Sequence, residues 1–174
     1  MNILAVGDVV GKSGLNYLHR RLRKLRQQYQ VDFTIANGEN TSGTGITPAQ
    51  ADSIFDAGAD VITLGNHVWN KRQIVPYLED NRYILRPANL APQLPGEGWY
   101  IYDAAGCRVL VMNLIGRCEM AFGPDNPFLA ADKILHQAAG AYDIAICEFH
   151  AGATSEKLAM GFYLDGRCAA VYGT

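Results

Sequence analysis

The sequence lacks the features that mark membrane-embedded, secreted or nucleic-acid-binding proteins. Charged residues make up only 18% of the 174 residues, and the net charge of −2 gives no general attraction for nucleic acid or an anionic membrane surface. No apolar run approaches the roughly 20 residues that a membrane helix needs. The opening stretch MNILAVGDVVGKSG reaches Asp8 too early for a secretory signal. We therefore expect neither a membrane span nor export.

Cysteine is also scarce, and its spacing forms no metal-binding or redox motif. The four cysteines are Cys107, Cys118, Cys147 and Cys168, and no two of them are separated as in CxxC. Cys147 and Cys168 lie in apolar runs, as buried cysteines commonly do. The expectation is a cytoplasmic protein with reduced thiols that bind no metal and form no disulfide.

What the sequence does contain is a regular alternation of strand-like and helix-like segments. With 49% hydrophobic residues, the chain is long enough for a single domain, residues 1–174, with a substantial core. The alternation predicts an α/β fold with a largely parallel sheet. A loop followed by an antiparallel strand pair is predicted over 86–107. Strands are predicted at 2–8, 31–40, 59–67, 108–116, 142–150 and 168–174, and amphipathic helices at 14–29 and 47–58.

Two features suggest other functions, and the residues argue against both. GDVVGKS at 7–13 is similar to a phosphate-binding loop, but it is one residue short, with Val6 at the position of the first glycine. Asp8 would also direct a negative charge at the phosphates. The predicted helix at 14–29 is rich in arginine and lysine, but no aromatic side chains alternate with these charges as stacking sites for bases would require. We interpret its charges as a solvated outer face.

Polar side chains follow several predicted strands at the point where each strand ends. In open α/β sheets, ligands bind outside the carboxyl ends of the strands, so these side chains are expected at one edge. Carboxylate, amide and imidazole donors without thiolate suit Mn, Fe, Ni or Zn ions rather than a structural zinc site. The sequence thus predicts a metal centre that includes Asp8, Glu39, Asn40, Asn66, His67 and His150.

The same residues lie in motifs that resemble a known family. GDVVGKSG, ANGENTSGTGITP, LGNHVWNKRQI, RPANL, NLIGR and FHAGATSEKLAMG are similar, in order, to the YmdB-type branch of the calcineurin-like metallophosphoesterases. The broader superfamily pattern is DxH, GDxx, GNH[DE], a lone His and GHxH. The YmdB-type branch replaces GDxx with GEN, as Glu39 and Asn40 do here, and lacks the histidine of DxH, where this chain has Val10.

The resemblance implies a sandwich of two β-sheets flanked by helices, in the layer order α/β/β/α. It implies hydrolysis of phosphodiesters, with cyclic nucleotides such as 2′,3′-cAMP and 3′,5′-cAMP as small-molecule substrates. Two divalent or trivalent metal ions are implied, with iron expected and Mn, Zn or Mg as alternatives. Asp8 and Asn40 match ligands of the first metal, Glu39 the bridging ligand, and Asn66 and His150 ligands of the second. His67 matches the proton donor.

The chain also departs from the family pattern. Glu148 and Gly152 stand where the family commonly has Asp and Glu in DFHAEATSEK, and Asn70 stands where an acid is common. The GHxH ligands would follow Thr174, so the expectation is a C-terminally incomplete domain that is a weak or inactive catalyst by itself. Two other functions stay open: a phosphoprotein or phosphomonoester phosphatase using the same site, and a non-enzymatic fragment that binds metal or nucleotide. Homo-oligomer formation is also left open.

Overall fold

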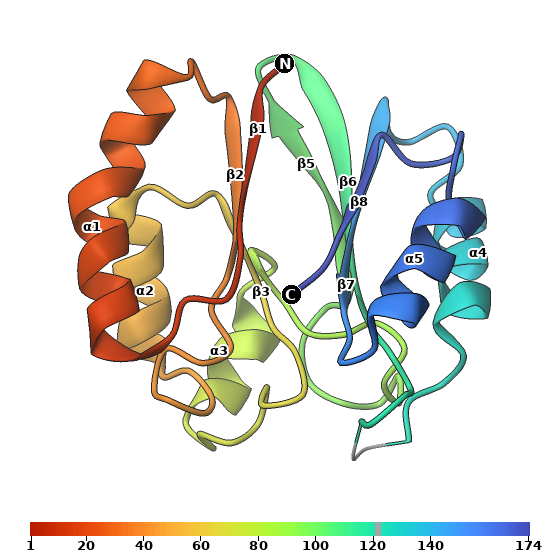
Figure 1. The fold of residues 1–174 in the computed structure, drawn as a ribbon, viewed down its shortest axis with the longest axis horizontal. Coiled ribbons are helices and arrows are strands. Elements are labelled where there is room, and N and C mark those ends of the chain that lie inside the picture. The colour runs from red at the N-terminus through yellow and green to blue at the C-terminus, as the bar shows by residue number, and fades with distance from the viewer. Residues whose placement is uncertain (121–122) are drawn as a thin grey trace.

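A computed structural model describes residues 1–120 and 123–174, and it confirms the predicted two-sheet sandwich flanked by helices. Figure 1 shows the four layers edge-on, with α1, α2 and α3 outside one sheet and α4 and α5 outside the other. The helices are α1 (Gly11–Gln28), α2 (Pro48–Ala57), α3 (Ile74–Asp80), α4 (Pro127–Gln137) and α5 (Thr154–Tyr163). The strands are β1 (Ile3–Val6), β2 (Phe33–Asn37), β3 (Val61–Thr63), β4 (Ile84–Leu85), β5 (Trp99–Ala104), β6 (Cys107–Ile115), β7 (Ile144–His150) and β8 (Ala170–Tyr172).

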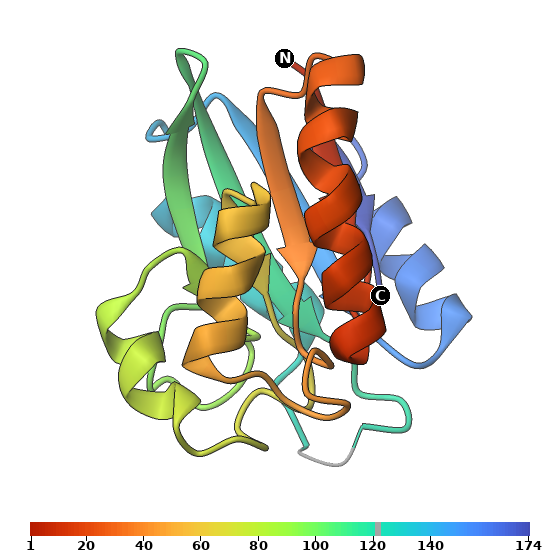
Figure 2. The same ribbon diagram turned by 90° about the vertical axis from the view of Figure 1, so that its left-hand side faces the viewer.

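The strand order brings the carboxyl ends of neighbouring strands to the same edge. The first sheet has the order β1-β2-β3-β4 and is parallel throughout. The second has the order β5-β6-β7-β8, in which only β5 runs antiparallel to its neighbour. The pair β5–β6 forms the antiparallel hairpin predicted after the proline-rich segment, although β6 continues through the run predicted as a separate strand. Figure 2 shows α1 and α2 lying side by side over the first sheet.

The core has three layers because successive side chains of a strand point to opposite faces. Ile35 and Val61 point from the first sheet toward the second and pack there with Val109, Val111 and Ile146. Their neighbours along the strands, Ala36 and Ile62, pack against α1 and α2 instead. A third cluster lies between the second sheet and α4 and α5. Burial on both faces explains why the strands are nearly continuous apolar runs.

Local sequence signals fix the ends of α2 as predicted. Thr47 accepts a hydrogen bond from the Gln50 backbone N–H, and the Gln50 side chain accepts one in return from the Thr47 backbone N–H, which forms a capping box. Pro48 occupies the first turn, and Gly58 ends the helix in the left-handed conformation with φ of 115°. The helix leads directly into β3, whose carboxyl end carries Asn66 and His67.

Asn113 on β6 connects the two sheets next to that carboxyl end. The side chain is fully buried, and its Nδ2 donates to the Leu64 carbonyl at 2.7 Å and to the Leu85 carbonyl at 2.9 Å. Replacing Asn113 with alanine should lower the free energy of unfolding by about 1–3 kcal/mol, because the buried Leu64 carbonyl loses its partner. Urea denaturation measures this change. The control is Thr34→Val, since the buried Thr34 hydroxyl has no hydrogen-bond partner in the part of the chain that the structure describes. A loss below about 0.5 kcal/mol for Asn113→Ala would contradict the role of this bridge.

No helix in residues 1–120 and 123–174 has both the length and the apolar character needed to cross a bilayer. All four cysteines are free thiols, with Cys118 exposed and Cys147 buried. Burial raises the pKa of the Cys147 thiol well above its ordinary value, which leaves it protonated and unreactive.

Candidate metal centre

The candidate centre lies where strand ends of both sheets meet. Asp8 follows β1, Glu39 and Asn40 follow β2, and Asn66 and His67 follow β3, all in the first sheet. The second sheet contributes His150, the last residue of β7. In Figure 1 the N-terminus is at the top, and β1 runs down from it toward this edge.

The Glu39 carboxylate lies in the middle of these six residues, which form the donor cluster. Glu39 is only 1% exposed, yet no lysine or arginine pairs with it among the described residues. Its Oε1 accepts from Asn40 Nδ2 at 2.9 Å and lies 3.3 Å from His67 Nδ1 and 3.4 Å from His150 Nε2. Its Oε2 accepts from the His67 backbone N–H at 3.2 Å. A buried carboxylate surrounded by neutral donors and imidazoles is a site that favours a cation.

The remaining predicted residues join the cluster through amides. Asn40 Nδ2 also donates to Asp8 Oδ2 at 2.6 Å, so this amide bridges the two carboxylates. Asn66 Oδ1 lies 2.9 Å from His150 Nε2, and Asn66 Nδ2 lies 3.2 Å from His67 Nε2. The structure therefore brings all six sequence-predicted residues together at one place, while their individual roles stay a prediction.

The donor atoms fit a bound cation. Asn40 Oδ1 is buried and has no hydrogen-bond partner among the described residues, as an unused metal ligand would be. His150 Nε2 faces two oxygens, Asn66 Oδ1 at 2.9 Å and Glu39 Oε1 at 3.4 Å, so these three potential ligand atoms lie close together. Among the described residues, no three His, Cys, Asp or Glu side chains are arranged to hold a metal by themselves, so the centre depends on amide oxygens as well.

Gly65 makes the close approach of these donors possible. A Cβ atom at this position would lie 2.2 Å from Glu39 Oε2 and 2.5 Å from His150 Nε2. The backbone between β3 and Asn66 thus forms one wall of the site, and only a residue without a side chain can occupy it.

Burial of His150 favours the form of its ring that binds metals. Burial lowers the pKa of His150 below its ordinary value, and the negative charges of Glu39 and Asp8 act in the opposite direction. The neutral imidazole is the metal-binding form, since a ligand nitrogen must carry a free lone pair.

Behind the donors lies a buried polar group that the sequence did not predict as part of the site. Glu148 on β7 is fully buried and contacts the Asn37 side chain on β2 and the Thr174 hydroxyl. Burial raises the pKa of Glu148 to about 7, while the hydrogen bonds from Asn37 and Thr174 act to lower it. The available signal was an amide residue, Asn37, at the end of the mainly apolar strand FTIAN.

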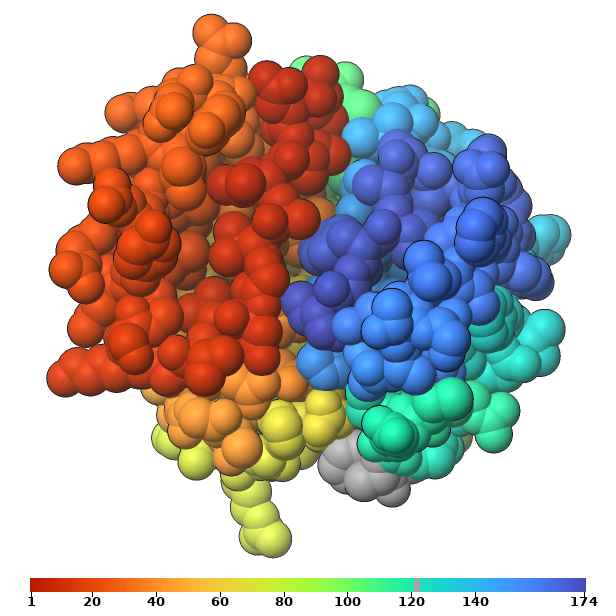
Figure 3. All heavy atoms as spheres, in the orientation of Figure 1, coloured from red at the N-terminus to blue at the C-terminus, as the bar shows by residue number. Residues whose placement is uncertain are grey.

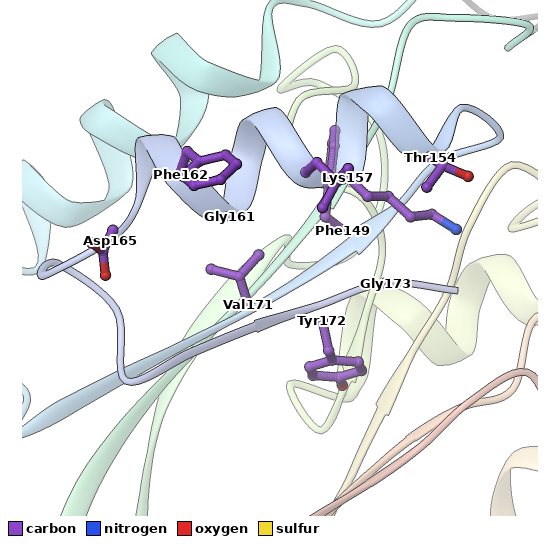
Figure 4. A pocket seen from close by; sticks show the side chains of 10 residues that line it. Phe149, Thr154, Lys157, Gly161, Phe162, Asp165, Val171, Tyr172 and Gly173 are labelled. Atoms are coloured by element: carbon purple, nitrogen blue, oxygen red, sulfur yellow. The ribbon is translucent and has the colours of Figure 1, made fainter.

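A separate hollow of about 540 Å³ lies between α5 and β8. Figure 4 shows Phe162 of α5 and Val171 of β8 on its walls, with Tyr172 on the opposite face of β8. Its lining is mainly apolar, and its charged side chains are Lys157 and Asp165. Nothing in it forms a group of catalytic or metal-binding side chains, so we place the functional site at the strand ends.

Comparisons with known proteins agree with the fold and the motifs. The family model described as "YmdB-like protein" matches residues 4–174. A 2′,3′-cyclic-nucleotide 2′-phosphodiesterase from Bacillus subtilis is 44% identical over 100% of this chain and 66% of its own length. A crystal structure of a hypothetical protein from Thermus thermophilus has a TM-score of 0.92 at 36% identity and covers 100% of this chain and 67% of that one.

A second crystal structure, described as that of a novel phosphatase from Mycoplasma pneumoniae, has a TM-score of 0.91 at 30% identity and covers 99% of this chain and 63% of that one. The chain therefore spans about two thirds of the length of the proteins it matches. Because the family model matches nearly the whole sequence and the solved structures share its complete fold, the chain belongs to the YmdB-like family.

Proposed function

We propose that the protein is a metal-dependent phosphodiesterase that hydrolyses cyclic nucleotides such as 2′,3′-cAMP and 3′,5′-cAMP at the strand-end centre. The observation that carries the proposal is the gathering of oxygen and nitrogen donors from both sheets around Glu39. The substrate class rests on the name of the Bacillus subtilis relative. The chain spans 66% of that relative, so the activity is proposed for the whole protein.

We expect the donor set to form two ligand groups that share Glu39. Asp8 and Asn40 would hold one cation, and Asn66 and His150 the other, with the Glu39 carboxylate between them. Oxygen-rich ligands with one imidazole suit iron, and they also suit Mn, Zn or Mg. Two such ions, when bound, lower the pKa of a water molecule and neutralise phosphoryl oxygens.

His67 is placed to serve as the proton donor. Its side chain is 31% exposed, more than those of Glu39 and His150, so a substrate can reach it. Its ring lies at the edge of the donor cluster, with Nε2 at 3.2 Å from Asn66 Nδ2 and Nδ1 at 3.3 Å from Glu39 Oε1. Imidazole as a group exchanges protons near neutral pH, which suits protonation of the departing ribose oxygen.

Metal removal and a substrate panel test the proposal. Chelation followed by dialysis should abolish hydrolysis of 2′,3′-cAMP, 3′,5′-cAMP and bis-p-nitrophenyl phosphate, and Mn²⁺ or Fe²⁺ should restore it, because the donors alone supply no nucleophile. Hydrolysis is followed by chromatography of the nucleotides and by release of p-nitrophenol. Activity that survives complete metal removal would refute the proposed mechanism.

A second candidate is a phosphomonoester or phosphoprotein phosphatase acting through the same centre. It is favoured by the similarity to the Mycoplasma pneumoniae structure, which is described as that of a phosphatase. The same panel distinguishes the two when it includes p-nitrophenyl phosphate and a phosphopeptide. Faster hydrolysis of these monoesters than of every diester would favour the phosphatase.

A further inference from the structure

A hydrogen-bonded chain of three side chains leads from the space between the sheets to His150. Asn37 and Glu148 are both fully buried, on β2 and β7 respectively. Asn37 Nδ2 donates to Glu148 Oε1 at 2.7 Å, and the Thr174 hydroxyl donates to the same oxygen at 2.9 Å. Thr174 Oγ1 lies 2.8 Å from His150 Nδ1, on the side of the ring that faces away from the donor cluster. In Figure 3 the C-terminal segment, in blue, reaches the boundary with the N-terminal segment, in red.

The hydrogen-bond partners determine which ring nitrogen of His150 carries a proton. The Asn37 amide has a fixed orientation because its Oδ1 accepts the Glu39 backbone N–H at 3.2 Å. Its Nδ2 therefore points at Glu148 and, at 3.3 Å, at Thr174 Oγ1. A threonine hydroxyl has one proton and two lone pairs. The proton goes to Glu148, one lone pair faces Asn37, and the other accepts the N–H of His150 Nδ1.

The opposite nitrogen, Nε2, then presents its lone pair to the metal site. It faces Asn66 Oδ1 at 2.9 Å and Glu39 Oε1 at 3.4 Å, and both oxygens are acceptors. Three lone pairs directed at one point repel each other unless a cation lies between them. The arrangement of Glu148, Thr174 and His150 is thus matched to a bound metal.

We propose that Glu148, acting through the Thr174 hydroxyl, orients His150 and keeps its Nε2 free to bind metal. Both are positioning residues, and the inference rests on the proposed function in one respect, namely that His150 is a metal ligand. Partners of this kind fix the tautomer and ring orientation of metal-bound histidines. Asn37 extends the same network to the backbone of Glu39. The buried network therefore contacts a predicted ligand on each sheet.

The cost of burying Glu148 supports a role beyond packing. A carboxylate without a cationic partner between two sheets is unfavourable, and an apolar side chain would fill this position at lower cost. Within residues 1–120 and 123–174 its Oε2 has no hydrogen-bond partner, so its hydrogen bonds converge on Oε1, the atom that Thr174 contacts. The Glu148 carboxylate therefore acts mainly as the acceptor for the hydrogen bonds that lead to His150.

The hydrogen-bonded chain from Glu148 through Thr174 to His150, here called the relay, is tested by variants at Thr174 with Zn²⁺ as the probe. Thr174→Val keeps the shape of the side chain but removes the hydroxyl, and Thr174→Ser restores it. The affinity for Zn²⁺, measured by competition with a chromophoric chelator, should fall about 10–100-fold in Thr174→Val. Thr174→Ser should bind as the wild type does. Thr34→Val, which removes a buried hydroxyl that bonds to none of the described residues, should also leave the affinity unchanged.

A second measurement reports on the proton directly and needs no substrate. In ¹H–¹⁵N spectra of the Zn²⁺-loaded protein, the Nδ1–H of His150 should give a slowly exchanging signal in the wild type and in Thr174→Ser. The signal should be lost in Thr174→Val, because the N–H no longer has an acceptor. Circular dichroism confirms that each variant is folded.

The outcomes separate this inference from the proposed function. Equal Zn²⁺ affinity in wild type and Thr174→Val would overturn the relay while leaving the metal centre intact. Failure of Thr174→Ser to restore binding would also overturn it, because the hydroxyl would then not be the active group. A wild type that binds no Zn²⁺ would overturn both the metal centre and the relay. Absence of phosphodiester hydrolysis alone would refute only the proposed activity.

Discussion

Replacing His67 with alanine should lower phosphodiester hydrolysis by about 10²–10⁴-fold while the bound metal stays nearly constant, because a general acid contributes a factor of this size. The expected constancy of the metal follows from the position of His67 at the edge of the donor cluster. Its backbone N–H donates to Glu39 Oε2, which the substitution keeps, and the substitution removes only the ring that lies 3.3 Å from Glu39 Oε1. Turnover is measured at saturating 2′,3′-cAMP, and metal content by elemental analysis of the same samples.

His150→Ala is the informative comparison, because it should lose metal as well as activity. His150 Nε2 points into the cluster between Asn66 and Glu39, and no other imidazole of the described residues takes its place from the second sheet. His136→Ala, at an exposed position of α4, serves as the control and should change neither quantity. Equal metal loss in His67→Ala and His150→Ala would show that His67 is a ligand rather than a proton donor.

The strand-end residues could be predicted because they obey simple positional rules. Parallel strands direct their carboxyl ends to one edge, so polar residues after buried strands converge whatever the loops between them do. The capping signals of α2 were equally local, with Thr47, Pro48 and Gly58 in their expected places. The burial of the strands on both faces also followed from their apolar composition.

Other parts of the fold were not predicted, for identifiable reasons. The short strand β4, Ile84–Leu85, is too brief to show an alternation of apolar and polar residues. Helix α3 has no side-chain cap and contains Pro76 in its first turn, so its sequence signal is weak. Helix α4 carries a local signal, since Asn126 caps it and Pro127 follows, but the sequence analysis predicts no helix there.

The network behind His150 was beyond sequence reasoning because it depends on how the two sheets pack. Asn37 and Glu148 are 111 positions apart, and they meet only because β2 and β7 face each other across the sandwich. Glu148 was visible in the sequence as a departure from the family motif, without any sign of its partners. Long-range pairs of this kind follow from strand register and sheet packing, which the amino-acid composition and the hydrophobic periodicity of the sequence do not determine.

Gly65→Ala should remove metal binding and hydrolysis together, although it adds only a single methyl group. The added Cβ would lie 2.2 Å from Glu39 Oε2 and 2.5 Å from both His150 Nε2 and Cδ2. These separations are far below van der Waals contact, so at least one of the two side chains must leave its position. Gly65 has no positive φ, so the requirement is for space and not for an unusual backbone conformation.

The displacement affects the residue proposed to lie between both metals and the ligand supplied by the second sheet. A ligand misplaced by about 1 Å can cost roughly 10²-fold in rate, and here two ligands are displaced at once. Gly161→Ala is the matched control, because a Cβ at that position of α5 meets nothing within 4 Å. The control should keep metal and activity and raise the free energy of unfolding by about 0.5–1 kcal/mol, as expected for Gly→Ala within a helix. Metal titration and hydrolysis are measured for both variants beside the wild type. If Gly65→Ala retained metal and turnover, Glu39 and His150 could not both be ligands in this arrangement.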